Sequence, residues 1–148
     1  MYSASGSTVD LGIGSNIITS GDKAYAIYST GSKDRSLLKA AGINVIMQVT
    51  AGHGVYAANG NSKVYLLGMN AVKISGEGAF GVVSSKERSL IDVDETIEIT
   101  TSGDKAAGGA IATVGKINLG QDSVIITRGN NAFGFQLKMG WLMPTISP

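Results

Sequence analysis

The chain is organised around the stretch Ile17-Ile18-Thr19-Ser20-Gly21-Asp22-Lys23-Ala24-Tyr25-Ala26-Ile27-Tyr28. Two short β-type runs, 17–19 and 24–28, flank a tight corner at Gly21 and Asp22. Glycine and aspartate favour such corners, because glycine has no Cβ and aspartate bonds to nearby backbone amides. Versions of this stretch recur four more times, so the chain repeats one structural unit five times.

A small residue anchors each copy, and the anchors follow one another at a nearly constant spacing: Ala24, Gly52, Ala79, Ala106 and Ala132. Seven positions before the anchor, every copy has a β-branched residue: Ile17, Val45, Val72, Ile99 and Ile125. A third run aligns Val9, Ser36, Val64, Ile91 and Ile117, and two positions further on Leu11, Leu38, Leu66, Val93 and Leu119. Three apolar runs that stay in step predict a repeat architecture.

Each unit has room for three strands of three to five residues. A propeller blade needs about four strands and 40 or more residues, so the unit is too short for one. The pattern predicts an all-β fold, a right-handed parallel β-helix (solenoid) of about five coils, with roughly 27 residues and three short strands per coil. Segment 37–41, the best helical candidate, is expected to be a strand. We expect Val9, Leu11, Ile17, Tyr25 and Ile27, with their equivalents, to point inward.

Three segments are expected along the chain. Residues 1–8 are small and polar and predict a frayed lead-in. Residues 9–137 form the β-helix coils. Residues 138–148 break the repeat and contain the only Trp and both Pro, so they predict a C-terminal cap or the truncated start of a next coil. The copy at Ala106 has lost its bulky residues, and its coil is expected to pack less tightly.

Composition excludes several classes of function. With 43% apolar residues, 148 residues can bury a core, and the net charge of +1 has no basic stripe for nucleic acid. The chain has no Cys, hence no disulfide framework and no thiolate metal site. No run of about 18 apolar residues is present, so this segment is not expected to insert into a membrane.

The motif at residues 20–29 (Ser-Gly-Asp-Lys-Ala-Tyr-Ala-Ile-Tyr-Ser) resembles the coil motif of bacterial autotransporter (type V secretion) passenger domains. The motifs at residues 53–60 and 78–82 resemble it as well. The resemblance covers residues 9–137 and implies a right-handed β-helix exported to the outer surface of a Gram-negative bacterium, commonly for adhesion. Signal peptide and membrane translocator are not in this chain, which favours a passenger fragment.

Two groups of carboxylates are candidates for chemistry. Asp22, Glu77, Asp104 and Asn130, with Thr50 between them, share one corner of successive coils. They are typical either of a Ca²⁺ column or of turn chemistry, and turn chemistry is favoured. The other group is Asp92, Asp94, Glu95 and Glu98, with Asp92 and Asp94 expected outward beside Asn118 and Tyr65. No Arg or Lys is expected in register on that face, which favours a solvated face over a lyase site.

The aromatic residues give the remaining candidates. His53 is the only His and shares a column with Tyr25, Phe80 and Phe133, which favours ring stacking over catalysis. A catalytic triad in its usual form is not expected. Thr19, Thr101 and Thr127 align, but Met47 and Ile74 interrupt them, which argues against an ice-binding array. Tyr28, Tyr56 and Tyr65 are expected outward, where exposed rings either contact a partner or stiffen the coil edge.

The sequence therefore predicts a non-enzymatic structural stalk with an adhesin surface, from a secreted or surface-displayed autotransporter passenger. Catalytic residues, metal and cofactor are predicted to be none. The expected partners are a host surface protein or glycan, or another copy through exposed coil ends. The alternative is a β-helical polysaccharide-processing enzyme or a phage tailspike-like glycan-binding protein. The expected location is extracellular or the bacterial cell surface, by way of the outer membrane and with a role in virulence.

Overall fold

The computed structural model describes residues 1–31, 33–112 and 115–138. In this part of the chain every regular element is a β-strand, and the strands form three parallel sheets. Sheet A contains β1 (Tyr2–Ser3), β4 (Tyr25–Ser29), β7 (His53–Ala57), β10 (Phe80–Ser84), β13 (Ala107–Ala112) and β16 (Phe133–Lys138). Sheet B contains β2 (Thr8–Ile13), β5 (Ser36–Ala41), β8 (Ser62–Leu67), β11 (Leu90–Val93) and β14 (Lys116–Asn118). Sheet C contains β3 (Asn16–Ser20), β6 (Asn44–Gln48), β9 (Met69–Ser75), β12 (Thr96–Thr101) and β15 (Val124–Thr127).

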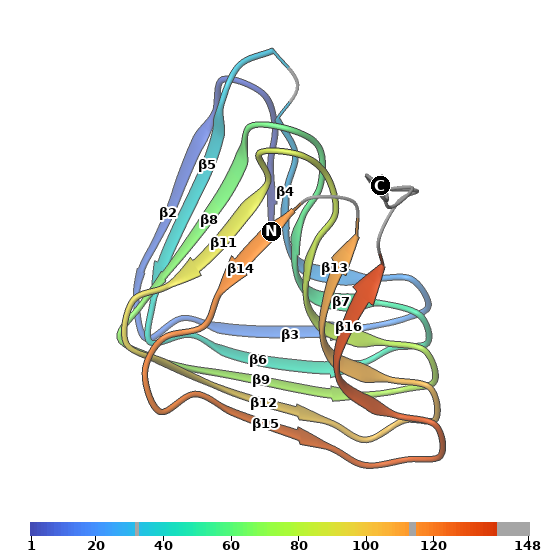
Figure 1. Cartoon of the computed structure of the whole chain (residues 1–148). Coiled ribbons are helices and arrows are strands. Elements are labelled where there is room, and N and C mark those ends of the chain that lie inside the picture. The colour runs from blue at the N-terminus through green and yellow to red at the C-terminus, as the bar shows by residue number, and fades with distance from the viewer. Residues whose placement is uncertain (32, 113–114, 139–148) are drawn as a thin grey trace, which may run out of the picture.

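The three sheets form the sides of a triangular β-solenoid (Figure 1). The chain runs down sheet B, across sheet C and up sheet A, while successive coils approach the viewer, so the winding is right-handed. Each central strand pairs with its equivalents in the coils before and after it, as β9 does with β6 and β12. The predicted all-β parallel β-helix of about five coils is confirmed, and segment 37–41 is part of the strand β5.

The β-branched column of sheet C stacks as predicted. Ile17 pairs with Val45, Val45 with Val72, Val72 with Ile99, and Ile99 with Ile125. The three central members are fully buried, and the two outer ones pack against the core from the terminal coils. β-Branched side chains suit this position, because they pack well on a pleated surface.

The alignment of the third run is wrong at its second copy, where Leu38 pairs with Val64 and Ala40 pairs with Leu66. Val9 pairs with Leu38, whereas Ser36 pairs with Ser62. The cause is a longer corner: seven positions separate Ser29 from Ser36, but five separate their partners Ala57 and Ser62. A constant period cannot represent this insertion, so the sequence alignment slipped by two positions there. A shift of two positions keeps each side chain on the same face of the strand, so the predicted inward side is still correct.

A ladder of serines fills the corner between sheets A and B. Ser36 Oγ lies 2.6 Å from Ser29 Oγ and 3.1 Å from Ser3 Oγ, and Ser84 Oγ lies 2.7 Å from Ser89 Oγ. These hydroxyls are buried and partner one another, which offsets the cost of removing them from water. Ser36, Ser62 and Ser89 recur once in each of three successive coils, a repeat that the sequence alignment missed.

The segment 1–8 is not a frayed lead-in. Tyr2 pairs with Tyr28 and Ser3 with Ser29, so β1 adds a strand to sheet A. Ser3 is buried, and its hydroxyl contacts Ser7 and Ser36. The polar composition that suggested fraying serves the serine ladder instead. The C-terminal cap predicted for residues 138–148 lies, apart from Lys138, outside the described residues.

Candidate functional site

An aromatic surface covers the N-terminal coils of sheet A, and we call it the aromatic face: Tyr2, Tyr25, Tyr28, His53, Tyr56 and Phe80. Two columns of the parallel register produce it. Tyr2, Tyr28 and Tyr56 pair in one column, and Tyr25, His53 and Phe80 pair in the other. The outward position of Tyr28 and Tyr56, predicted from the sequence, agrees with their half-buried side chains between buried neighbours.

The inward position predicted for Tyr25 is wrong. Tyr25 is 38% exposed, while Ala26 and Ile27 after it are both fully buried. Two consecutive inward residues break the alternation of the strand, and the residue before them therefore faces outward. The same pair recurs as Gly54-Val55 and Gly81-Val82.

The first residue of this inward pair must be small, because it points at the β-branched column of sheet C. A Cβ added to Gly81 would lie 2.3 Å from Cγ2 of Ile99, and one added to Gly54 would lie 2.6 Å from Cγ1 of Val72. This contact explains why the three central copies have Gly at this position. The sequence contained this signal as an invariant small column beside the aromatic one.

The rings of the aromatic face form one connected cluster. Tyr2 stacks on Tyr28 with 5.4 Å between ring centroids and 8° between planes, and Tyr25 stacks on Tyr56 at 5.4 Å and 13°. Tyr25 also lies 5.1 Å from Tyr28, which joins the two columns. His53 continues the cluster with edge contacts at 5.2 Å to Tyr25, Tyr56 and Phe80. Such packing holds the rings in fixed positions, so the surface is preorganised.

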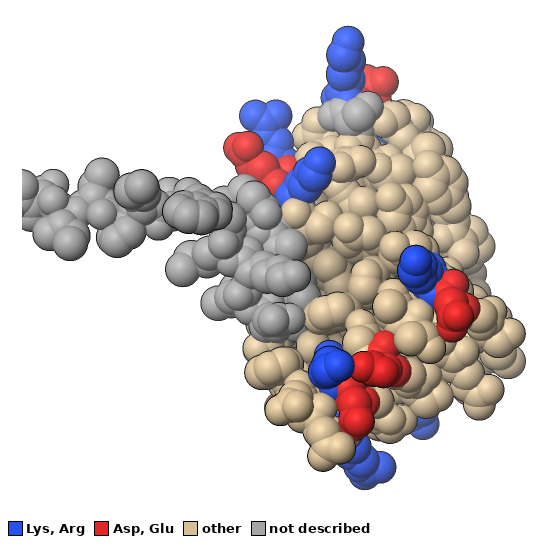
Figure 2. All heavy atoms as spheres, turned by 90° about the vertical axis from the view of Figure 1, so that its right-hand side faces the viewer, with Lys and Arg blue, Asp and Glu red and all other residues tan. Residues whose placement is uncertain are grey.

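The aromatic face is open to solvent and carries no charge within its two columns. Tyr2 is 61% exposed, and a hollow of about 360 Å³ is lined by Met1, Tyr2, Tyr25 and Tyr28. Figure 2 shows this side of the molecule, with charged side chains above and below the described part of the sheet and few across its middle. An uncharged aromatic surface of this kind suits the flat face of a sugar or an apolar protein patch.

Burial alters the two titratable groups at the centre of the cluster. It raises the pKa of Tyr28, and the neighbouring phenols Tyr56, Tyr2 and Tyr25 add to the rise. It lowers the pKa of His53, and the nearby backbone of Gly52 partly opposes this shift. The Nδ1 atom of His53 is buried and has no hydrogen-bond partner among the described residues. His53 is therefore a neutral ring within an aromatic stack at neutral pH, as the sequence pattern favoured.

Tyr65 lies apart from the other two candidate tyrosines. It is on the outer side of β8 in sheet B, paired with Lys39 and Asp92. Its ring makes no aromatic contact within the part of the chain that the structure describes. The structure thus joins Tyr28 and Tyr56 to four further rings and places Tyr65 in a different setting.

The corner residues lie in turns whose backbones are bonded from one coil to the next. Lys23, Ala51, Gly78 and Lys105 have positive φ angles, and the amide of each donates to the carbonyl of the adjacent coil's corner at 2.8–2.9 Å. Asp104 accepts the amide of Asn130 at 2.7 Å, and Glu77 pairs with Lys105 at 2.9 Å, which raises the pKa of Lys105. Among the described residues no group of three His, Cys, Asp or Glu side chains converges on a position for a metal ion.

Among the described residues, the acidic side chains of β11, β12 and the corner between them do not converge on one point. Asp92 faces outward as predicted, and its carboxylate accepts a hydrogen bond of 2.9 Å from the amide of Asn118. The expectation that no Lys or Arg stands in register on this face is wrong, because Asp10, Lys39, Tyr65, Asp92 and Asn118 form one column. The slipped alignment of the first two coils concealed Lys39.

The threonine column faces the interior. Thr19 pairs with Met47, Met47 with Ile74 and Ile74 with Thr101, and Thr101 is fully buried. It therefore belongs to the core and offers no regular threonine surface. Sequence reasoning also missed three cations that line a shared hollow: Lys63 on β8, Lys116 on β14 and Arg88 in the turn before β11. Lys63 and Lys116 precede Val64 and Ile117, which the sequence aligned correctly, so this column was the signal that identifies them.

Comparison of the chain with models of protein families, with curated proteins and with solved structures gives no match. No helix in the described part of the chain has the length and apolar character that crossing a bilayer requires. The functional argument therefore rests on the surfaces of the solenoid themselves.

Proposed function

We propose that the chain is a segment of a secreted or surface-displayed bacterial autotransporter passenger, in which the β-helix is a structural stalk and the aromatic face is an adhesin surface. The motif resemblance at residues 20–29 supports the family. The parallel solenoid supports the stalk, because every central strand is hydrogen-bonded to both neighbours and the coils form a continuous stack. The proposed location is the bacterial surface or the extracellular space.

The observation that carries the adhesin role is the uncharged, preorganised cluster of rings on sheet A. A monomeric surface seldom exposes so many adjoining rings without a partner, since interfaces are enriched in Tyr and other aromatic residues. Rings already held in place lose little side-chain entropy on binding. The proposed partner is a host surface protein or a neutral glycan, and the proposed role is non-enzymatic.

The double variant Tyr25→Ala/Tyr28→Ala tests this role. Binding of the purified chain to cultured epithelial cells and to a neutral glycan array is compared with that of Ile18→Ala/Ile46→Ala, which removes two exposed apolar side chains from the outer side of sheet C. We expect the double variant to lose binding about tenfold or more, because buried aromatic anchors dominate interface energy. The control Ile18→Ala/Ile46→Ala should bind like the parent.

Equal binding by the double variant and the parent, with both folded, would exclude the aromatic face as the adhesin surface. Concentration-dependent association of the parent in place of cell or glycan binding would point to self-association. Self-association would use the edge strands, since β14 and β15 have one neighbour each within the described residues.

The second candidate is a polysaccharide-processing enzyme or a tailspike-like glycan-binding protein. The column of Lys39, Tyr65 and Asp92 favours it, because it places a cation, a ring and a carboxylate on one face. Asp92→Ala should abolish glycan cleavage if this candidate is right. Absence of cleavage by the parent on acidic and neutral polysaccharides would leave the non-enzymatic proposal standing.

A further inference from the structure

Sheet B carries a second surface feature, which we call the cationic hollow. It has a volume of about 460 Å³ and is lined by Asn61, Lys63, Arg88, Ser89, Leu90 and Lys116. Three of the six side chains are cations, from three successive coils. The aromatic face has no such residue, so the two features would recognise different ligands.

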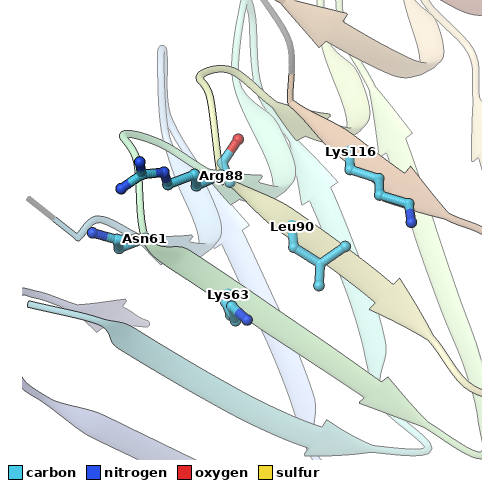
Figure 3. Close-up of a pocket in the computed structure, with 6 residues that line it drawn as sticks. Asn61, Lys63, Arg88, Leu90 and Lys116 are labelled. Atoms are coloured by element: carbon cyan, nitrogen blue, oxygen red, sulfur yellow. The ribbon is translucent and has the colours of Figure 1, made fainter.

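The parallel register sets the spacing of the cations. Leu90 pairs with Lys63 on one side and with Lys116 on the other. The two lysines are therefore two strand spacings apart, about 10 Å along the solenoid axis. Figure 3 shows Leu90 between them and Arg88 reaching from the turn before β11 toward Asn61. Arg88 is fixed in a left-handed turn conformation with φ of 64°.

The positive charge of the hollow is not neutralised by an ion pair. Within the described ranges the one ion pair of the structure joins Lys105 and Glu77, on another corner. Two carboxylates lie close along the chain: Glu87 precedes Arg88 on the exposed turn, and Asp92 follows Leu90 on the same face. Asp92 is engaged by the amide of Asn118. Lys63, Arg88 and Lys116 are therefore available to an anionic ligand.

A ring lies on the same face, outside the residues that line the hollow. Tyr65 follows Lys63 by two positions, so both side chains lie on the outer side of β8. Tyrosine offers a flat apolar face and a hydroxyl, which suits a sugar ring. Two cations about 10 Å apart, a third at the corner and a ring on the same face match a chain of sugars that carries acidic groups.

We propose that the cationic hollow binds an acidic polysaccharide, a linear glycan with carboxylate or sulfate groups, laid along the solenoid axis across β8, β11 and β14. Lys63 and Lys116 contact successive acidic groups, Arg88 contacts a third from the corner, and Tyr65 stacks on a sugar. This site lies on sheet B and takes an acidic glycan, whereas the adhesin surface proposed above lies on sheet A and takes a protein or a neutral glycan. A nucleic acid is disfavoured, because the chain has a net charge of +1 and no basic stripe.

The test measures binding of the complete chain to heparin and polygalacturonate oligosaccharides, with neutral dextran and single-stranded DNA as further probes. The variants are Lys63→Gln, Lys116→Gln and their combination. Lys73→Gln is the matched control, because Lys73 is exposed on sheet C and its loss changes the net charge equally. Each surface variant is first checked for an unchanged melting temperature.

We expect at least one of the two acidic oligosaccharides to bind and dextran not to bind. Each lysine substitution should weaken binding about tenfold, the amount typical of a hydrogen bond to a charged group. The double variant should also show a smaller dependence of affinity on salt, since two charge contacts are lost. Lys73→Gln should bind the acidic oligosaccharides like the parent. Tyr25→Ala/Tyr28→Ala should also bind them like the parent, because its substitutions affect the aromatic face alone.

Three results would overturn the proposal. The first is binding of neither acidic oligosaccharide. The second is equal weakening by Lys73→Gln and by the hollow variants, which would mean non-specific attraction. The third is tighter binding of DNA with the same dependence on Lys63 and Lys116, which would identify a nucleic acid as the ligand.

Discussion

The outer faces of sheet A and sheet B belong to the same coils, yet their side chains differ in kind. Sheet A stacks six rings with no charge among them, whereas the outer columns of sheet B contain Lys39, Lys63, Asp92 and Lys116. Their interiors are alike, with buried aliphatic residues such as Val55 and Val64. The comparison shows that stacking restricts the residue types of the inward columns. The outward columns are under no such restriction, so their side chains can differ between sheets and bind different ligands.

The two faces also differ in how their outward residues are selected. In sheet B the strands alternate inward and outward, as in β8, where Val64 and Leu66 are buried. In sheet A the inward pair of Ala26 and Ile27 shifts the alternation, so Tyr25 joins Tyr28 on the outside. One local irregularity thus doubles the number of ring columns on sheet A.

The shared interior gives the largest expected effect. Ile99→Asp places an unpaired carboxylate in the β-branched column, where the parent side chain is fully buried. The free energy of unfolding should fall by on the order of 5 kcal/mol, enough to unfold the chain and remove both surfaces together. Ile18→Asp is the control on the same sheet, because Ile18 is 75% exposed. Chemical denaturation that leaves Ile99→Asp as stable as Ile18→Asp would mean that the column is not inside.

The irregularity of sheet A gives the next effect. Gly81→Ala adds a Cβ that would lie 2.3 Å from Cγ2 of Ile99 and 2.4 Å from the carbonyl oxygen of Gly108. The unfolding free energy should drop by about 3 kcal/mol through overpacking. Gly134→Ala is the equivalent change in the last coil, where no atom of the described residues lies within 4 Å of the added Cβ, and it should be nearly neutral. Similar denaturation midpoints for the two variants would contradict the inward position of Gly81.

The ring contacts of the two faces can be compared directly. Tyr28 contacts the rings of Tyr2, Tyr25 and Tyr56, whereas Tyr65 contacts no ring among the described residues. Tyr28→Ala should therefore cost about 2 kcal/mol more than Tyr65→Ala, because it loses three aromatic pairs, each at the lower end of the range of about 0.5–1.5 kcal/mol. Urea denaturation measures the difference. Equal costs would show that the cluster adds no stability and that its rings are held by other contacts.

The pH dependence of the sheet A face gives the smallest effect. Burial lowers the pKa of His53, so the unfolded chain binds a proton more readily than the folded one. The stability associated with neutral His53 is present above the unfolded pKa of about 6.5 and is lost as the pH falls through the lower folded value. His53→Phe should flatten the melting temperature between about pH 7.5 and 5. A pH profile identical to that of the parent would mean that other groups dominate.

The sequence predicted most of what packing dictates. The column from Ile17 to Ile125 was predicted in full, because inward positions tolerate few residue types and the repeat period is nearly constant there. The position of Tyr28 and Tyr56 followed from the alternation after the corner. The autotransporter family, the adhesin role and the surface location stay predictions.

The failures have physical causes in particular residues. The alignment of Ser36 failed because the corner after Ser29 is two positions longer than the next one. Tyr25 was placed inside because strict alternation was assumed across the inward pair at Ala26 and Ile27. The cationic hollow was missed although Lys63 and Lys116 share a column of the sequence alignment, because Arg88 lies in the turn before β11 and joins them only in the folded corner.

The measurement that tests the stacking most directly is disulfide formation between engineered cysteines, since the chain has none of its own. Lys73 and Thr100 pair across β9 and β12 on the outer side of sheet C, and Ile46 lies one coil further away in the same column. Adjacent coils bring the Cα atoms within disulfide range, whereas two coils separate them by about 10 Å. Lys73→Cys/Thr100→Cys should oxidise readily and Ile46→Cys/Thr100→Cys should stay reduced. Failure of the first pair to cross-link, or equal oxidation of both, would contradict a chain whose coils lie one on the next in this register.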